Sequence, residues 1–295
     1  MAVGDGERRA QIIQAVINEA EARGGILTST ELAGISVAGE PHRVVDRAKG
    51  IWNPRYLDAT LSVVSSPDGP YNDREVEGGF IHYAYEAGGT AGNNTKLRRA
   101  FELQLPIIFL KKIGKGAYIP FAPVYVVGDD PEKREFLLSL EETPMSADLL
   151  RPDALLERRY AERSVLQRLH QREFRARVLQ AYERRCAICL LKHAPLLDAA
   201  HITQDGAEHG VPVVSNGLSL CKIHHAAYDQ NFIGIAPSYK VHVDSTLLEE
   251  VDGPMLKHGL QEMHGRFLVV PSRPAERPDE ERLAERFVRF LARAG

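Results

Sequence analysis

The chain has 295 residues, of which 44% are hydrophobic, and its 37 Lys and Arg against 40 Asp and Glu give a formal net charge of −3. This length predicts about two domains, and the composition is typical of a globular protein. No segment approaches the roughly 18 apolar residues that a membrane span needs, and the start "MAVGDGERRA" lacks the apolar core of a signal peptide. We therefore expect a cytoplasmic protein without a membrane partner.

The N-terminal half is predicted to begin with a helix and to continue as a β-rich region. The helix is expected over 7–25, where an apolar face ends at a pair of glycines. The face consists of Ile12, Ile13, Val16, Ile17 and Ala20, and the glycines are Gly24 and Gly25. From about residue 50 to 140 the strand-like runs are "TLSVV", "GGFIHYAYE", "LPIIFLKKI", "AYIPFAPVYVVG" and "REFLLSL". Their spacing predicts a small barrel or curved sheet.

A domain boundary is expected at 143–153, and a long helix over about 154–184. One helix face is apolar, with Val165, Leu169, Phe174, Val178 and Tyr182. Another face carries Arg168, Arg172 and Arg175, in a segment that holds ten arginines against five acidic residues between Arg151 and Arg185. This basic face is either the solvated side of a connecting helix or an arm that faces phosphates, and the motif that follows it favours the arm.

All three cysteines of the chain lie in one pattern of paired ligands. Cys186 and Cys189 form a C-x-x-C pair, and Cys221 and His224 form a C-x-x-H pair 31 residues later. Tetrahedral Zn²⁺ takes four such ligands, so the spacing predicts a structural zinc site. Buried free thiols are the plain alternative. A redox dithiol is less favoured because no βαβ pattern follows.

The segment "LLDAAHI" between the two pairs predicts a buried strand that carries one histidine. Its apolar residues are Leu196, Leu197, Ala199, Ala200 and Ile202. Alone, His201 would be read as a core histidine with its hydrogen bonds satisfied. It is followed, however, by Asn216, then by His225, and one helical turn later by Asp229.

The pattern "LLDAAHI…NGLSLCKIHHAAYD" resembles the HNH nucleases, in which a ββα-metal motif binds one divalent metal between a hairpin and a helix. The likeness covers about residues 176–236, and the preceding "RRYAERSVLQRLHQREFRARVLQAYERRCAIC" resembles the leader of bacterial HNH restriction nucleases. The resemblance implies that His201 is the general base, that Asn216 holds the histidine-bearing loop, and that His225 binds Mg²⁺ or Mn²⁺. Asp229 is placed to be a further ligand. Products with 5′-phosphate and 3′-hydroxyl ends are also implied.

One position departs from that family. Many members carry a metal-binding Asp or His just before the general base, where this chain has Ala200. Asp198 lies two residues earlier on the same strand face and is a candidate to replace it.

The segment "GPYNDREVEGGFIHYAYEAGGTAGNNTKLRRAFELQLPIIFLKKI" resembles, more loosely, the SET and RING-associated (SRA) domain, over about residues 50–127. This resemblance implies a curved barrel that extrudes a modified cytosine into a pocket. By position, Tyr71 matches the stacking tyrosine, Trp52 is a candidate second face, and Asp58 or Asp73 would read the cytosine amino group. Asn94, Lys96, Arg98 and Arg99 are candidates for phosphate contacts. The alternatives are that the aromatic residues are core and that Asp73 serves a turn.

Together these observations predict an α+β protein with three parts: an SRA/PUA-like curved barrel with flanking helices at 1–150, a basic helical connector at 151–185, and a ββα-metal HNH domain with a structural zinc and a C-terminal helical extension at 186–295. The predicted function is modification-dependent cleavage of double-stranded DNA that carries 5-methylcytosine or 5-hydroxymethylcytosine. One HNH site cuts one strand, so a double-strand break predicts a homodimer or two encounters. The alternatives are that the enzyme reads another mark (a phosphorothioate) or plain sequence, that the protein binds DNA but is catalytically impaired, or that it is a zinc-stabilised interaction protein.

Overall fold

The computed structural model describes residues 4–46, 49–65, 80–86, 91–140, 155–204 and 210–294, with side chains from residue 166 onward in the fifth range and up to residue 293 in the last. The predicted boundary at 143–153 and the predicted pocket residues Tyr71 and Asp73 lie outside these residues. The chain forms two compact units. The first comprises Met1–Glu21 and Gly25–Leu169, and the second comprises Ala22–Gly24 and His170–Gly295.

The first unit begins with the predicted helix, α1 (Asp5–Ala22), which buries the expected apolar face against the sheet. The chain leaves this helix at Gly24 and Gly25, both with positive φ, and the Gly25 amide donates to the Ala20 carbonyl at 2.7 Å. A fully buried arginine also fixes α1, because the Arg9 guanidinium donates to the carbonyls of Ala59 and Pro106 at 3.1 and 3.2 Å. The helix is thereby joined to the two segments that lead into neighbouring strands.

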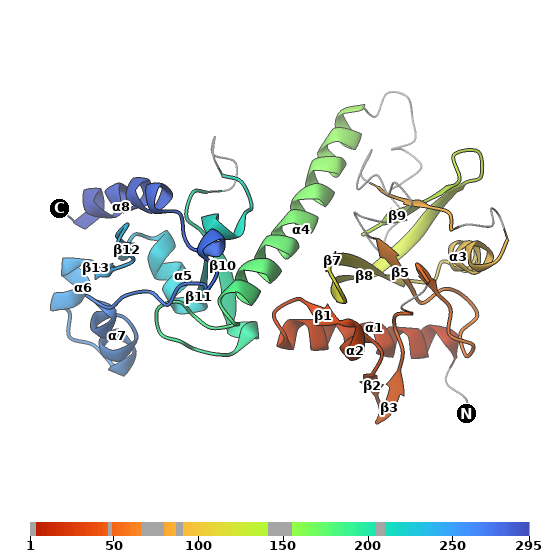
Figure 1. The fold of residues 1–295 in the computed structure, drawn as a ribbon, viewed down its shortest axis with the longest axis horizontal. Helices are drawn as coiled ribbons and strands as arrows, with labels where there is room; N and C mark the ends of the chain where they lie inside the picture. Colours follow the sequence, from red (N-terminus) through yellow and green to blue (C-terminus); the bar gives the residue numbers. More distant parts are fainter. Residues whose placement is uncertain are drawn as a thin grey trace. The chain divides into compact units, whose positions relative to one another are not determined.

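All five predicted strand runs form strands of one seven-stranded sheet in the order β4-β5-β7-β8-β9-β6, with β1 also paired to β8. The long strand β8 pairs with β7 along its first half and with β9 along its second, with register shifts on both sides, and the sheet curls (Figure 1). The bounds are β1 Leu27–Thr28, β4 Ile51–Trp52, β5 Ser62–Ser65, β6 Ile81–Ala84, β7 Ile107–Gly114, β8 Ala117–Asp130 and β9 Glu135–Ser139. Within the described residues β4 and β6 do not pair, so the sheet is a half-barrel.

Besides the two-residue strands β1 and β4, four elements of this unit were not predicted. They are α2 (Ser29–Leu32), the hairpin of β2 (Ile35–Val37) and β3 (Glu40–His42), and α3 (Asn93–Glu102). The first three are too short to show a period. Helix α3 has only three apolar residues in ten positions and starts without a side-chain cap, so its sequence carries a weak start signal.

The predicted long helix, α4 (Leu155–Ala181), begins in the first unit and continues into the second, and its apolar side chains Leu169, Phe174 and Val178 are buried as expected. An antiparallel pair follows, β10 (Leu197–His201) with β11 (Gly217–Cys221), and then α5 (Lys222–Asp229). Figure 1 shows α5 next to this pair. The strand at 197–201 was predicted, but Leu196 was expected to be buried and is 50% exposed, because it lies in a short 3-10 turn before the strand.

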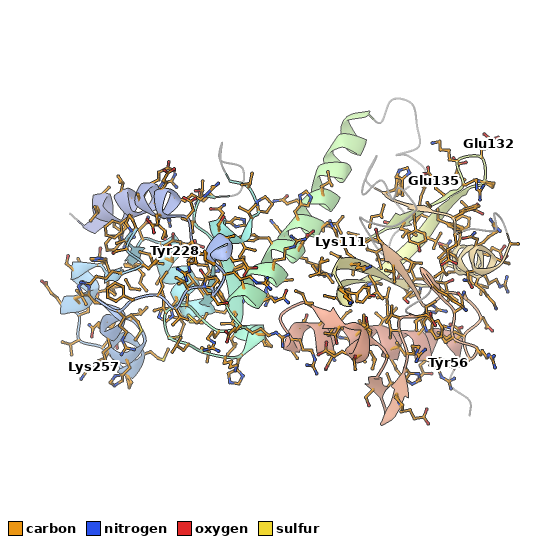
Figure 2. All side chains as sticks on the ribbon, in the orientation of Figure 1. Tyr56, Lys111, Glu132, Glu135, Tyr228 and Lys257 are labelled. Atoms are coloured by element: carbon orange, nitrogen blue, oxygen red, sulfur yellow. The ribbon has the colours of Figure 1, made fainter. Side chains whose placement is uncertain are left out.

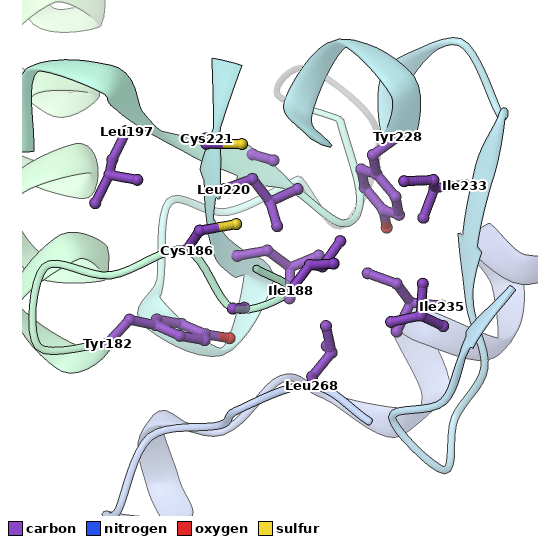
Figure 3. Close-up of a cluster of buried hydrophobic side chains, with 14 of the residues drawn as sticks. Tyr182, Cys186, Ile188, Leu197, Leu220, Cys221, Tyr228, Ile233, Ile235 and Leu268 are labelled. Carbon is purple, nitrogen blue, oxygen red and sulfur yellow. The ribbon is translucent and has the colours of Figure 1, made fainter. Parts of the chain in front are cut away.

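The rest of the second unit follows α5 in the chain, and its first strand contacts that helix. A hairpin of β12 (Ile233–Ile235) and β13 (Val241–Val243) was not predicted, whereas the final helix α8 (Glu280–Ala294) was. Between them lie α6 (Ser245–Glu249) and α7 (Pro254–Gly259). One apolar core joins α4, the β10–β11 pair, α5 and the β12–β13 hairpin, and Figure 3 shows part of it around Leu220, Tyr228 and Ile233.

The mixed α+β class predicted from the sequence is confirmed, with a curled half-barrel sheet in the first unit. Among the helices that the structure describes, none is long and apolar enough to cross a membrane.

The start of β11 lies directly against α4, which gives a test of the core. A Cβ atom added at Gly217 would be 2.5 Å from Val178 Cγ2 and 2.9 Å from Phe174 Cζ. We expect Gly217→Ala to lower the free energy of unfolding by about 1–3 kcal/mol, since overpacking forces buried neighbours to move. The measurement is urea-induced unfolding followed by circular dichroism. Gly114→Ala is the control, because nothing lies within 4 Å of its added Cβ. Equal stability of the two variants would contradict the packing described here.

Candidate metal and nuclease site

Three cysteines and one histidine converge in the second unit. The ligand atoms of Cys186, Cys189, Cys221 and His224 all lie within 4.8 Å of one another, and this is the only such group of three or more His, Cys, Asp or Glu in the described part of the chain. His224 Nδ1 is 3.4 Å from Cys186 Sγ and 3.2 Å from Cys221 Sγ, and Cys189 Sγ is 4.0 Å from Cys221 Sγ. In a tetrahedral zinc site with ordinary bond lengths the ligand atoms are separated by roughly 3.5–3.8 Å. The residues therefore fit a zinc ion.

The surroundings of the cluster also suit a metal. His224 Nε2 lies 2.8 Å from the Gly259 carbonyl oxygen, which favours a proton on that nitrogen and leaves Nδ1 toward the sulfur atoms. Hydrogen bonds within the cluster raise the pKa of the Cys186 thiol and lower the pKa of the Cys221 thiol, so Cys221 is the sulfur atom that favours the thiolate form. The cluster also borders the core, where Figure 3 shows Cys186 and Cys221 beside Leu220.

Local backbone structure explains why the sulfur atoms meet. After α4, Glu183 and Arg184 adopt positive φ and redirect the chain into the first ligand pair. The Leu190 amide donates to the Cys186 carbonyl at 3.0 Å, and Leu190 itself has positive φ, which forms a tight knuckle. The Ala187 amide donates to the Ser219 carbonyl at 2.7 Å and so fastens the knuckle to β11, which ends at the third cysteine.

His201 lies at the end of β10, where it pairs with Gly217 of β11. Its ring stacks on Phe174 of α4, with ring centroids 4.1 Å apart and an interplanar angle of 16°. Phe174 is buried, so the apolar face of α4 fixes one face of the imidazole. Because side chains alternate along a strand, His201 points to the face opposite to that of Asp198 and Ala200.

Asn216 is fully buried and joins both ends of the segment between β10 and β11. Its Oδ1 accepts from the Thr203 amide at 2.8 Å, and its Nδ2 donates to the carbonyls of Thr203 and Val211, both at 3.0 Å. The Ile202 amide donates to the Asn216 carbonyl at 2.9 Å. One asparagine thus holds the backbone that follows His201, which is a positioning role.

His225 of α5 lies between two carboxylates. Its Nδ1 is 3.6 Å from Asp198 Oδ2, and its Nε2 is 3.2 Å from Asp229 Oδ2. The structure therefore brings together all three residues that the sequence nominated for the catalytic cation. They approach different nitrogens of one ring, whereas a single cation binds only one of them. His201 stacks on Phe174, whereas His225 contacts two carboxylates.

Asp198 also contacts two basic side chains. Lys222 Nζ is 2.7 Å from its Oδ2, and Arg175 Nε is 3.7 Å from its Oδ1. Burial alone would raise the pKa of Asp198, but the contacts with Lys222 and His225 outweigh it and hold the pKa below its usual value. Arg175 donates as well to the Leu197 carbonyl at 2.8 Å, so this predicted arm residue ties α4 to β10. Sequence reasoning missed Lys222, which no spacing rule marks.

Two arginines of α8 bind the carboxyl end of α5. Arg286 Nη2 donates to the Tyr228 carbonyl at 2.8 Å, and Arg293 Nη1 donates to the Gln230 carbonyl at 2.7 Å. Positive charge at this end of a helix is favourable because the last carbonyls lack partners within the helix. The sequence predicted α8 but not that its arginines hold the helix that carries His225.

In the first unit, Asp58 and Lys96 lie together at the surface, where Lys96 Nζ donates to the Asp58 carbonyl at 3.3 Å. Trp52 is half-buried, packs against the core, and donates its indole N–H to the Arg43 carbonyl at 2.8 Å. Trp52 therefore packs partly against the core, which agrees in part with the alternative that the aromatic residues belong to the core.

Asn94 and Arg98 of α3 are engaged inside the first unit. Asn94 is 1% exposed, and its amide accepts from the Glu86 amide at 3.0 Å and donates to the Glu86 carbonyl at 3.1 Å. Arg98 Nε donates to Asp129 Oδ2 at 2.5 Å, and Nη2 donates to the Tyr85 hydroxyl at 3.1 Å. These contacts connect α3 to the segment that follows β6 and to β8. Of the four candidates on α3, Lys96 and Arg99 have exposed side chains. Arg99 pairs with Glu102 at 3.0 Å.

Comparison with known protein families identifies the segment that carries this site. Residues 186–236 match the family model described as HNH endonuclease. The match confirms the resemblance predicted from the sequence, and with it an enzyme of the DNA endonuclease class. It spans the four candidate zinc ligands and the segment from β10 through β12. No curated protein matches the chain.

Two solved structures have partial likeness to the chain. One is titled modification dependent TagI restriction endonuclease: it is 17% identical, the match covers 78% of this chain and 81% of that chain, and the TM-score is 0.28. The other is the Type IV phosphorothioation-dependent restriction endonuclease ScoMcrA: it is 17% identical, the match covers 62% of this chain and 51% of that chain, and the TM-score is 0.22. TM-scores this low do not establish a shared overall fold.

The cluster predicts zinc-dependent stability. We expect purified protein to hold about one zinc per chain and His224→Ala to lose it, with the second unit destabilised, because structural zinc contributes folding free energy. Zinc content by mass spectrometry and thermal unfolding measure both effects. The matched control is His258→Ala, an exposed histidine on α7 that pairs with Glu262. Full zinc content in His224→Ala would contradict the assignment.

Proposed function

We propose that the protein is a modification-dependent restriction endonuclease in which the second unit hydrolyses DNA phosphodiester bonds and the first unit selects the DNA. The observation that carries the hydrolytic part is the arrangement of β10, β11 and α5. It places His201 at a strand end held by Phe174 and Asn216, and His225 on the adjoining helix beside Asp198. The zinc cluster supports this arrangement from one side and does not take part in the reaction.

His201 is proposed to act as the general base. A neutral imidazole accepts a proton from water near neutral pH as that water attacks phosphorus. The stacking contact with Phe174 restricts the rotation of the ring, and Asn216 holds the backbone that follows it. Such positioning reduces the reorganisation needed for attack.

His225, together with the carboxylate of Asp198 or of Asp229, is proposed to hold a Mg²⁺ or Mn²⁺ ion. That ion would supply positive charge at the developing phosphorane and at the leaving 3′-oxygen. In an in-line displacement the attacking and leaving oxygens lie on opposite sides of phosphorus. The base and the metal-binding residues are therefore proposed to lie on opposite sides of the phosphate.

The first unit is proposed to read 5-methylcytosine or 5-hydroxymethylcytosine by base flipping, with Trp52, Tyr71, Asp58 and Asp73 near the base and Lys96 at the backbone. The support is the resemblance to the SRA domain together with a curled half-barrel sheet. On the connector, Arg168 and Arg172 have exposed side chains on α4 and are proposed to face phosphates. Cutting both strands would take a homodimer or two encounters.

Loss of the general base should abolish most hydrolysis. We expect His201→Ala to slow metal-dependent nicking of plasmid DNA by roughly 10²–10⁴-fold, the usual contribution of a positioned proton acceptor. His193→Ala, an exposed histidine of the same unit, is the matched control and should keep wild-type rates. Zinc content verifies that both variants fold. Nicking by His201→Ala at the wild-type rate would overturn its role.

The choice of DNA is tested with matched plasmids that differ only in their modification. We expect cleavage of plasmids carrying 5-methylcytosine or 5-hydroxymethylcytosine and little cleavage of the unmodified plasmid. Cleavage confined to phosphorothioate-linked DNA would assign another mark, and equal cleavage of all plasmids would indicate plain sequence recognition. Binding of modified duplex without cleavage in Mg²⁺ or Mn²⁺ would indicate an impaired nuclease that holds DNA.

A further inference from the structure

We propose that Asp198 replaces the ligand missing at Ala200, that the divalent cation binds between Asp198 Oδ2 and His225 Nδ1, and that the Lys222 ammonium competes with this cation until DNA arrives. The inference rests on the proposed nuclease function and specifies how its metal site is assembled.

The gap between the two donor atoms suits an ion better than a direct contact. Asp198 Oδ2 and His225 Nδ1 are 3.6 Å apart, which is too long for a hydrogen bond. Two neighbouring ligands at about 2.1 Å from an octahedral Mg²⁺ ion are separated by roughly 3.0 Å, so Asp198 and His225 would move together by roughly 0.6 Å to bind the same ion. Asp198 also shares its strand face with Ala200, so a carboxylate is available on the side where the usual ligand is missing.

Asp229 then has a different role from the one first suggested by its spacing. It lies 3.2 Å from His225 Nε2, the ring nitrogen that faces away from Asp198. Histidines that bind metals commonly direct their second ring nitrogen to a carboxylate, which orients the ring and makes it a better donor. Asp229 is therefore a positioning residue, and the helix end that carries it is held by Arg286.

Lys222 occupies the oxygen that the cation needs. Its Nζ is 2.7 Å from Asp198 Oδ2, and Arg175 lies at the other oxygen of the same carboxylate. A divalent cation placed there meets two positive neighbours, which weakens its binding in the absence of DNA. The Lys222 side chain is 57% exposed, so it can leave Asp198 and bind an incoming phosphate. DNA binding and metal binding are then coupled through one lysine.

The test measures Mn²⁺ binding to zinc-loaded protein without DNA, by electron paramagnetic resonance. We expect Lys222→Gln to bind Mn²⁺ roughly fivefold more tightly than wild type, because it removes an ammonium that competes for a partly exposed carboxylate. Asp198→Asn should lose binding, and Asp229→Asn should weaken it by roughly tenfold. Lys257→Gln is the matched control, since Lys257 is an exposed lysine on α7 (labelled in Figure 2). In nicking assays Lys222→Gln should be slower than wild type despite its tighter metal binding.

Several results would overturn the inference. Unchanged or weaker Mn²⁺ binding by Lys222→Gln would show that the lysine does not compete with the cation. Retained binding by Asp198→Asn together with lost binding by Asp229→Asn would place the cation at the other ring nitrogen. The Mn²⁺ measurement needs neither DNA nor turnover. If all variants follow the expected binding order while wild type fails to nick DNA, the metal site stands and the proposed nuclease function fails.

Discussion

The second unit depends on the convergence of three sulfur atoms and one imidazole at the point where β11 passes into α5. Cys221 is the last residue of the strand, and His224 lies in the first turn of the helix. A metal bound there fixes the angle between strand and helix, and the knuckle at Cys186 adds a hydrogen bond from Ala187 to the middle of β11. That angle in turn sets the distance from His225 to Asp198 across the hairpin.

The proposed catalytic residues are held by contacts from outside the family-matched segment. α4 precedes that segment, and it supplies Phe174 under the ring of His201 and Arg175 at β10. α8 follows it and supplies Arg286 at the carboxyl end of α5. The segment that matches the HNH endonuclease model is thus built into a larger core, and the absence of side-chain volume at Gly217 allows α4 to pack against the hairpin.

Much of this arrangement was predictable from the sequence because the relevant signals are local. The spacing of the cysteines and His224 predicted their convergence, and the periodicity of α1, α4 and the long strands predicted those elements. Other features depend on tertiary contacts that no short pattern records. Asn94 was expected to contact phosphate, but its side chain is buried against Glu86. Lys222 reaches Asp198 only because β10 and α5 lie side by side. The hairpin β12–β13 was missed because its strands have three residues each.

X-ray absorption at the zinc edge of the purified protein tests the central claim most directly. The account predicts a first shell of three sulfur atoms at about 2.3 Å and one nitrogen at about 2.0 Å. A shell of oxygen and nitrogen atoms alone, or the absence of zinc, would contradict it. The strand, the helix and the knuckle would then lack the shared zinc ion that is proposed to hold them together.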